Sequence, residues 1–155
     1  MAHETLTMLE RVIGSLILGG IVGFERERVQ KPAGLRTIML VTLGSTLVML
    51  LAQRMPLYTV LQVDVVTMDP TRILAALVQG IGFLGAGTIF LQRDRVRGLT
   101  TAAAIWTMAV VGAAVGVGDW ALAIAGTTGA FFILHLMGAL SPRLGGAQPP
   151  REKNG

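Results

Sequence analysis

The sequence predicts an all-α membrane protein, a polytopic bundle of about five transmembrane helices. Only 14% of its 155 residues are charged and 52% are hydrophobic, whereas soluble domains carry about 25% charged residues. The mean hydropathy is +0.65. Five apolar stretches approach the roughly 20 residues that a spanning helix needs. They cover residues 8–24, 35–52, 73–91, 99–117 and 120–140.

The ends of these stretches are typical of membrane helices. Glu10 and Arg11 stand near the start of the first, where they reach the membrane interface. Asp69 and Pro70 open the third as its N-cap and its first helical residue. The third and fourth stretches contain no charged residue, and His135 is the only titratable group in the fifth.

The basic residues predict the orientation of the bundle. Ten of the 13 Lys and Arg residues follow the first, third or fifth stretch. Cytoplasmic loops carry such an excess, which places the N-terminus outside and the C-terminus in the cytoplasm. The net charge of +4 is therefore explained by loops, and no nucleic-acid partner is expected. Residues 1–140 are expected to form the transmembrane domain and 141–155 a disordered cytoplasmic tail.

Small residues form two stripes at four-residue spacing. Ser15, Gly19 and Gly23 make the first, and Gly112 and Gly116, a GxxxG pair, make the second. Small residues let helix backbones approach closely in lipid. The stripes predict tight packing within one bundle in preference to a dedicated dimer face.

A further set of glycines, Gly80, Gly82, Gly85 and Gly87, lies in the third stretch. Its first three members match the dinucleotide fingerprint, but that motif needs a strand before it and a helix that opens at the glycines. An uncharged apolar stretch offers neither. The set instead predicts a bent or locally unwound helix, which protein or a water-filled cavity must surround, or else close packing.

Four charged residues, Glu25-Arg26-Glu27-Arg28, continue from the first stretch without a break. The first three fall near the membrane boundary, where an unpaired buried charge costs several kcal/mol. One interpretation is a functional polar cluster of Glu25, Glu27 and Arg36 at the inner mouth of the bundle. The other is a solvated helix end with local ion pairs that contribute little. The charges alone favour neither.

The composition argues against an enzyme and against a Mg2+ channel within one protomer. The chain has no cysteine, no H-E-x-x-H motif and no serine in a nucleophile setting. Mg2+ needs several oxygen ligands, yet none of the nine acidic residues lies in the middle of a stretch. No cofactor is expected, and no metal site is located.

Two short segments resemble each other. Gly34-Leu35-Arg36-Thr37 and Gly98-Leu99-Thr100-Thr101 lie 64 residues apart, each after a predicted inner loop. They suggest a parallel repeat of the kind found in transporters, although four matched positions in glycine-rich sequence also arise by chance.

Together these motifs resemble the MgtC/SapB family over residues 9–140. The resemblance rests on residues 20–28, 31–37, 69–73, 80–87 and 96–103. It marks the candidate functional residues Glu25, Arg26, Glu27, Lys31, Arg36, Thr37, Asp69, Arg72, Arg97, Thr100 and Thr101.

The resemblance implies a multi-pass protein of the bacterial inner membrane, linked to growth under Mg2+ limitation and, in pathogens, to virulence. Members are thought to act on other membrane machinery, notably the F-type ATP synthase, and not to transport Mg2+ themselves. Many carry a cytoplasmic ACT-like domain after the last span, where this chain has residues 141–155. Regulation through that domain is therefore not expected here.

We expect a regulator that works by contact within the lipid bilayer. Its partner would be a membrane protein, the ATP synthase or a transporter, and a homo-oligomer is a further option. The alternative is a transporter of Mg2+ or another ion, with a path along the glycine-rich third helix.

Overall fold

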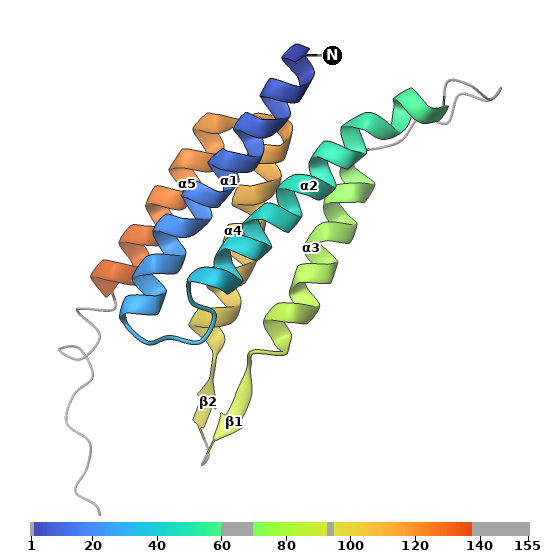
Figure 1. Cartoon of the computed structure of the whole chain (residues 1–155). Coiled ribbons are helices and arrows are strands. Elements are labelled where there is room, and N and C mark those ends of the chain that lie inside the picture. Colours follow the sequence, from blue (N-terminus) through green and yellow to red (C-terminus); the bar gives the residue numbers. More distant parts are fainter. Residues whose placement is uncertain (1, 60–69, 93–94, 138–155) are drawn as a thin grey trace, which may run out of the picture.

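The computed structural model describes residues 2–59, 70–92 and 95–137, which form five helices and one short hairpin (Figure 1). The predictions for Asp69 and for the tail 141–155 lie outside the described residues. The five helices match the five predicted stretches, so the all-α class is confirmed. Their bounds are α1 (Ala2–Arg28), α2 (Leu35–Thr59), α3 (Pro70–Ala86), α4 (Leu99–Val117) and α5 (Trp120–Phe132), which a π-helical turn, η1 (Ile133–Met137), continues.

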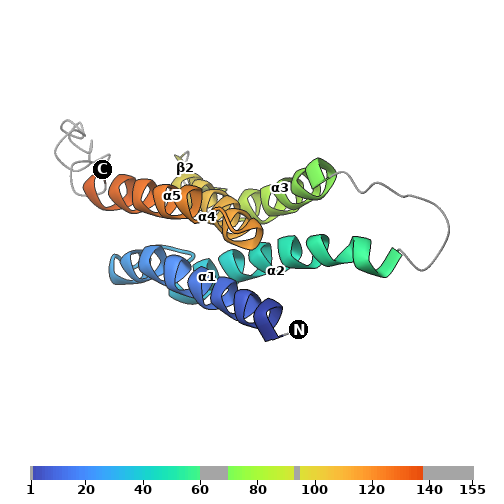
Figure 2. The same cartoon turned by 90° about the horizontal axis from the view of Figure 1, so that it is seen from above.

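The helices lie in two layers, with α1 and α2 in one and α3, α4 and α5 in the other (Figure 2). Three helical segments are long and apolar enough to cross a membrane, namely Ala2–Arg28, Leu35–Met55 and Leu99–Val117. α3 and α5 are apolar but shorter. The N-terminal orientation stays a prediction.

The third stretch is shorter as a helix than its hydropathy predicts. α3 ends at Ala86, and β1 (Phe90–Gln92) pairs antiparallel with β2 (Arg95–Arg97). The prediction of one helix over 73–91 was therefore wrong at its end. Hydropathy counts Phe90 and Leu91 as membrane residues, but Gly87 and Thr88 interrupt the helix before them. The Thr88 hydroxyl donates a hydrogen bond to the Gly85 carbonyl at 2.7 Å and so completes the last turn.

α4 is the central helix of the bundle. In its most apolar window 61% of the residues are buried, against 22% in α1. Its Ile105, Met108 and Val115 share a core with Val22 of α1 and Ile38 of α2. α4 begins after Gly98, whose φ of 92° is left-handed and suits a residue without a Cβ.

Both predicted small-residue stripes face helices of the same chain. A Cβ on Gly19 would stand 2.9 Å from the Thr42 hydroxyl oxygen, and one on Gly23 would stand 2.9 Å from the Leu35 Cα. On α4, a Cβ on Gly112 would collide with the Thr42 carbonyl oxygen, and one on Gly116 would stand 2.6 Å from the Met49 Cβ. The stripes therefore hold α1 and α4 against α2 within one bundle.

Candidate functional site

The charged motif lies where α1 ends and turns back to α2, which we call the charged end of the bundle. α1 stays helical through Arg28. The chain then reverses through Gln30 and Ala33, whose φ angles of 51° and 57° are left-handed. Because successive helical residues are about 100° apart, the neighbouring charges of the motif reach different partners.

Arg26 is buried and holds three segments together. Its Nε donates to the Ala33 carbonyl at 3.1 Å, and its Nη2 donates to the Pro32 carbonyl at 2.8 Å. The same Nη2 donates to the Thr101 hydroxyl at 2.8 Å. Arg26 therefore ties the α1–α2 loop to the first turn of α4. The fork of guanidinium donors suits such a junction better than a single ammonium group would.

Glu25 is also buried, and it faces the other side of the bundle. Its Oε1 lies 3.7 Å from Nδ1 of His135 in η1. The His135 ring stacks on Phe131, with ring centroids 5.6 Å apart and planes 4° apart. A π-helical turn is rare and is frequent at functional sites. Here it sets the imidazole beside the carboxylate and joins α1 to the end of α5.

Glu27 caps the next helix. Its Oε2 accepts a hydrogen bond from the backbone N–H of Leu35 at 2.9 Å. A helix start leaves such N–H groups without intrahelical partners, and a carboxylate there also meets the positive end of the helix dipole. A Cβ on Gly34 would collide with the Glu27 carboxylate, so the glycine makes room for the cap.

The predicted cluster of Glu25, Glu27 and Arg36 does not form. Glu25 points to η1 and Glu27 to α2, while Arg36 is exposed and makes no polar contact with the described residues. The solvated alternative is also wrong for Glu25 and Arg26, which are 7% and 2% exposed. Thr101 joins the charged end through Arg26. The other candidates in the described part of the chain are exposed: Lys31, Arg36, Thr37, Arg72, Arg97 and Thr100.

The glycine-rich third helix is continuous. α3 runs through Gly80, Gly82 and Gly85 without unwinding, and Gly87 lies beyond its end. Gly85 packs on Ala102, 3.6 Å from a built Cβ, whereas a Cβ on Gly80 or Gly82 would meet nothing within 4 Å. Neither local unwinding nor close packing within the protomer accounts for Gly80 and Gly82.

Sequence reasoning missed a second polar site at the opposite end of the bundle. Arg11 donates to the Gly116 carbonyl at 2.7 Å and to the Gln53 side-chain oxygen at 3.1 Å. Gln53 donates to the same Gly116 carbonyl at 2.7 Å. A cavity of about 450 Å³ lies over this network, lined by His3, Glu4, Thr7, Met8, Arg11, Leu50, Gln53 and Arg54. The signal was Arg11 itself, a charge placed inside an apolar stretch.

Buried hydroxyl groups were missed as well. Thr42 and Thr46 donate to carbonyls one turn back on α2, and Thr46 also lies 2.8 Å from the Gly112 carbonyl of α4. The Ser45 hydroxyl is buried and has no hydrogen-bond partner among the described residues. The spacing of these residues on one face of α2 was the available signal, since hydroxyls bond across close helices in membranes.

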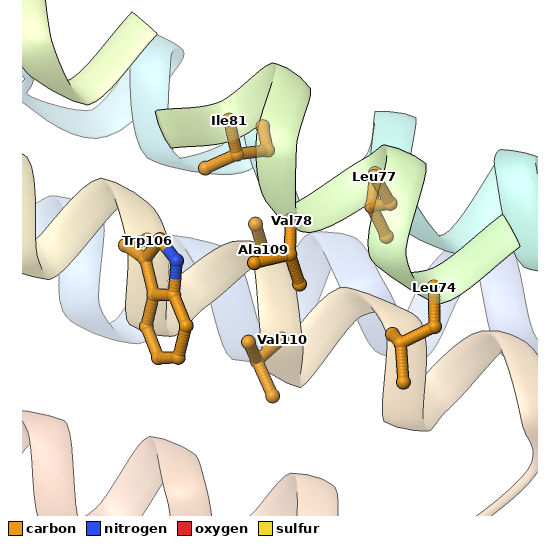
Figure 3. Close-up of a pocket in the computed structure, with 7 residues that line it drawn as sticks. All are labelled: Leu74, Leu77, Val78, Ile81, Trp106, Ala109 and Val110. Atoms are coloured by element: carbon orange, nitrogen blue, oxygen red, sulfur yellow. The ribbon is translucent and has the colours of Figure 1, made fainter. Parts of the chain in front are cut away.

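A small apolar crevice lies between α3 and α4 (Figure 3). Leu74, Leu77, Val78 and Ile81 line it from α3, and Trp106, Ala109 and Val110 line it from α4. Among the described residues, no three His, Asp or Glu side chains gather where they would hold a metal ion.

The fold defines a helical membrane protein whose charged motif joins the ends of its helices. The chain belongs to the MgtC family, because the sequence model of that family matches residues 12–142. It is 39% identical over 140 residues to "Putative magnesium transporter YhiD" of Escherichia coli K12. These residues make up 90% of this chain and 65% of that protein.

Two further relatives extend this comparison. Protein MgtC of Brucella abortus is 43% identical over 107 residues, which is 68% of this chain and 40% of that protein. Protein SrpB of Synechococcus elongatus is 37% identical over 137 residues, 83% of this chain and 72% of that protein. The chain thus spans less than two thirds of YhiD and MgtC. No solved structure matches it.

Proposed function

We propose that this protein is a regulator of ion and energy homeostasis that acts in the bacterial inner membrane under Mg2+ limitation. Membership of the MgtC family and the magnesium in the name of YhiD support the link to Mg2+. The regulator works by contact with another membrane protein. We propose the F-type ATP synthase first, because the family resemblance points to it, and a transporter second.

The observation that carries this proposal is the close packing of the core. α1 and α4 approach α2 so closely that a single Cβ at Gly19, Gly23, Gly112 or Gly116 would meet backbone or Cβ atoms. An ion path needs room and polar lining through the membrane, whereas these interfaces are filled. The groups that remain available for a functional contact are on the surface, where another protein binds them.

The charged end supplies a candidate contact surface. Arg26 and Glu27 are engaged in holding the loop and the start of α2. They leave Arg28, Lys31 and Arg36 exposed around that loop. This set of cations fits an acidic surface on the partner, and charge complementarity of this kind sets specificity and association rate.

The transporter alternative is favoured by the name of YhiD alone. Its path would follow the crevice between α3 and α4 (Figure 3), although no glycine of α3 is among the residues that line it. The crevice is lined only by apolar side chains. A Mg2+ ion, which dehydrates reluctantly and prefers oxygen ligands, finds none of these there.

Flux measurements separate the two functions. The purified protein is reconstituted into sealed liposomes with a trapped Mg2+ dye, beside a Glu25→Gln variant and a Glu10→Gln control. Glu10 lies on the same helix but is exposed. We expect no flux above empty vesicles from any of the three. Flux that Glu25→Gln abolishes and Glu10→Gln preserves would make the protein a transporter.

Partner capture tests the positive side of the proposal. The protein is expressed at native level in its host, cross-linked in intact membranes and purified, beside a Lys31→Glu/Arg36→Glu double variant of equal abundance. We expect ATP synthase subunits, or those of a transporter, with the parent and a loss of at least about fivefold with the variant, because each charge reversal opposes the pairing with an acidic surface. Equal capture of any partner by both proteins would refute the contact surface.

A further inference from the structure

α3 presents an unpartnered face to the outside of the bundle. It stands at the edge of its layer (Figures 1 and 2) and packs mainly on α4. Its packed side carries Leu77, Ile81 and Gly85, which are partly or fully buried. At about 100° per residue, Gln79 and Phe83 are the two residues in the middle of α3 that point most directly away from this side.

Gln79 is a polar side chain near the middle of α3. It is exposed and makes no hydrogen bond with any described residue. Its neighbours Val78 and Ile81 line the crevice opposite Ala109 and Val110, which lie halfway along the membrane-spanning α4. An amide group in hydrocarbon without a hydrogen-bond partner is unfavourable. Lipid is therefore an unfavourable environment for this amide.

Small residues form one strip of this face beside Gln79, and Phe83, which is 80% exposed, flanks the strip. Ala75, Gly82 and Ala86 are exposed, and with Gln79 they follow spacings of four, three and four residues. This alternation of four and three residues is typical of the seam of two helices that pack with a left-handed twist. α5 exposes bulky side chains that suit lipid, Leu122 and Ile124 among them.

We infer that this face of α3 is a homodimer interface, in which Gln79 bonds to Gln79 of a second copy. All copies insert in the membrane with the same orientation, so the two-fold axis of a dimer runs along the membrane normal. Each residue of α3 then meets its own counterpart at the same depth. The amide is self-complementary because it carries both a donor and an acceptor. A different partner would need a polar group placed at that one depth.

This interface goes beyond the proposed regulatory contact and does not depend on it. The charged end stays exposed when two α3 helices pair, because it is formed by α1, α2, α4 and η1. The interface also gives Gly82 a role that the protomer does not, since small residues allow two backbones to approach.

Cysteine cross-linking tests the interface in native membranes. The chain has no cysteine, so Ala75→Cys and Gly82→Cys each supply a single thiol on the seam. Ile124→Cys is the control, exposed on α5. With a mild oxidant we expect disulfide-linked dimers from the two seam variants and at least about tenfold less from the control, because a disulfide needs Cα atoms within about 7 Å. Equal cross-linking at all three sites, or none at the seam, would overturn the inference.

Substitution of Gln79 separates a specific bond from chance proximity. In Gln79→Leu the seam loses its only amide while the helix stays apolar, so folding of the protomer is retained. We expect dimerisation in detergent or in vesicles to weaken about tenfold, as for one interhelical hydrogen bond, and Gln79→Asn to restore part of it. A dimer of unchanged strength in Gln79→Leu, or cross-links to a different protein in place of the second copy, would count against the pairing.

Discussion

Replacing Gly112 with alanine adds one methyl group where α2 and α4 come closest, and we expect it to destabilise the bundle. The new Cβ would collide with the Thr42 carbonyl oxygen and stand 2.9 Å from the Ser45 Cβ. The first of these is a backbone atom of a helix. It has no rotamer through which to move away, so the two helices must separate.

The expected cost follows from overpacking a close-packed interface. Forcing an extra methylene into a filled core costs about 1–3 kcal/mol. Separation also stretches the contact between the Thr46 hydroxyl and the Gly112 carbonyl, now 2.8 Å, and a weakened hydrogen bond adds about 0.5–1.5 kcal/mol. We therefore expect a loss of about 2–4 kcal/mol in the free energy of unfolding.

Thermal unfolding of the purified protein in detergent, followed by the fluorescence of Trp106 and Trp120, measures this change. Gly44→Ala is the matched control. It places the same methyl group on α2 where nothing lies within 4 Å, and it should leave the midpoint unchanged or raise it slightly because alanine favours helix. If Gly112→Ala unfolds at the same temperature as Gly44→Ala, the close approach of α2 and α4 is wrong.

Three further substitutions probe the helix ends. Arg26→Gln removes buried hydrogen bonds from a guanidinium to Pro32, Ala33 and Thr101 and should cost about 1.5–3 kcal/mol in unfolding free energy. Exposed Arg28→Gln should stay within about 0.5 kcal/mol, and equal effects would contradict the junction. Glu27→Ala should cost about 0.5–2 kcal/mol and speed hydrogen exchange in the first turn of α2, and unchanged exchange would remove its role as a cap. Arg11→Gln should cost about 1–2 kcal/mol at the α4 C-terminus in the same unfolding assay, and a cost no larger than that of Arg54→Gln would count against the contact.

Hydropathy predicted the helices well because lipid leaves the backbone few alternatives. A chain segment in hydrocarbon must satisfy its own N–H and C=O groups, so an apolar stretch of sufficient length becomes a helix. α4 covers the predicted residues 99–117, and α2 starts at the predicted Leu35. The rule fails at 87–91, because hydropathy does not distinguish a helix from an apolar strand and carries no measure of where glycine and threonine interrupt the turn.

The sequence pattern also located the charged end, but it did not predict which groups its residues contact. The run from Glu25 to Arg28 marked the right place, and burial of Glu25 and Arg26 decided that it is more than a solvated helix end. Which groups they meet was not readable, since Pro32, Thr101 and His135 lie 6, 75 and 110 positions from their partners in the chain. Contacts of that separation depend on how helices pack, and the packing is not encoded in any one segment.

The sequence by itself determined the membrane class, the five helices, the family and the small residues that permit close packing, because each depends on composition or spacing within one segment. Tertiary structure alone decided that Gly19, Gly23, Gly112 and Gly116 pack against α2 inside the protomer, while Gly82 and Gln79 remain on its surface. The sequence does not show whether the helix face that carries a glycine is packed or exposed. Only the positions of neighbouring helices divide such residues between the core and a surface left open to a partner.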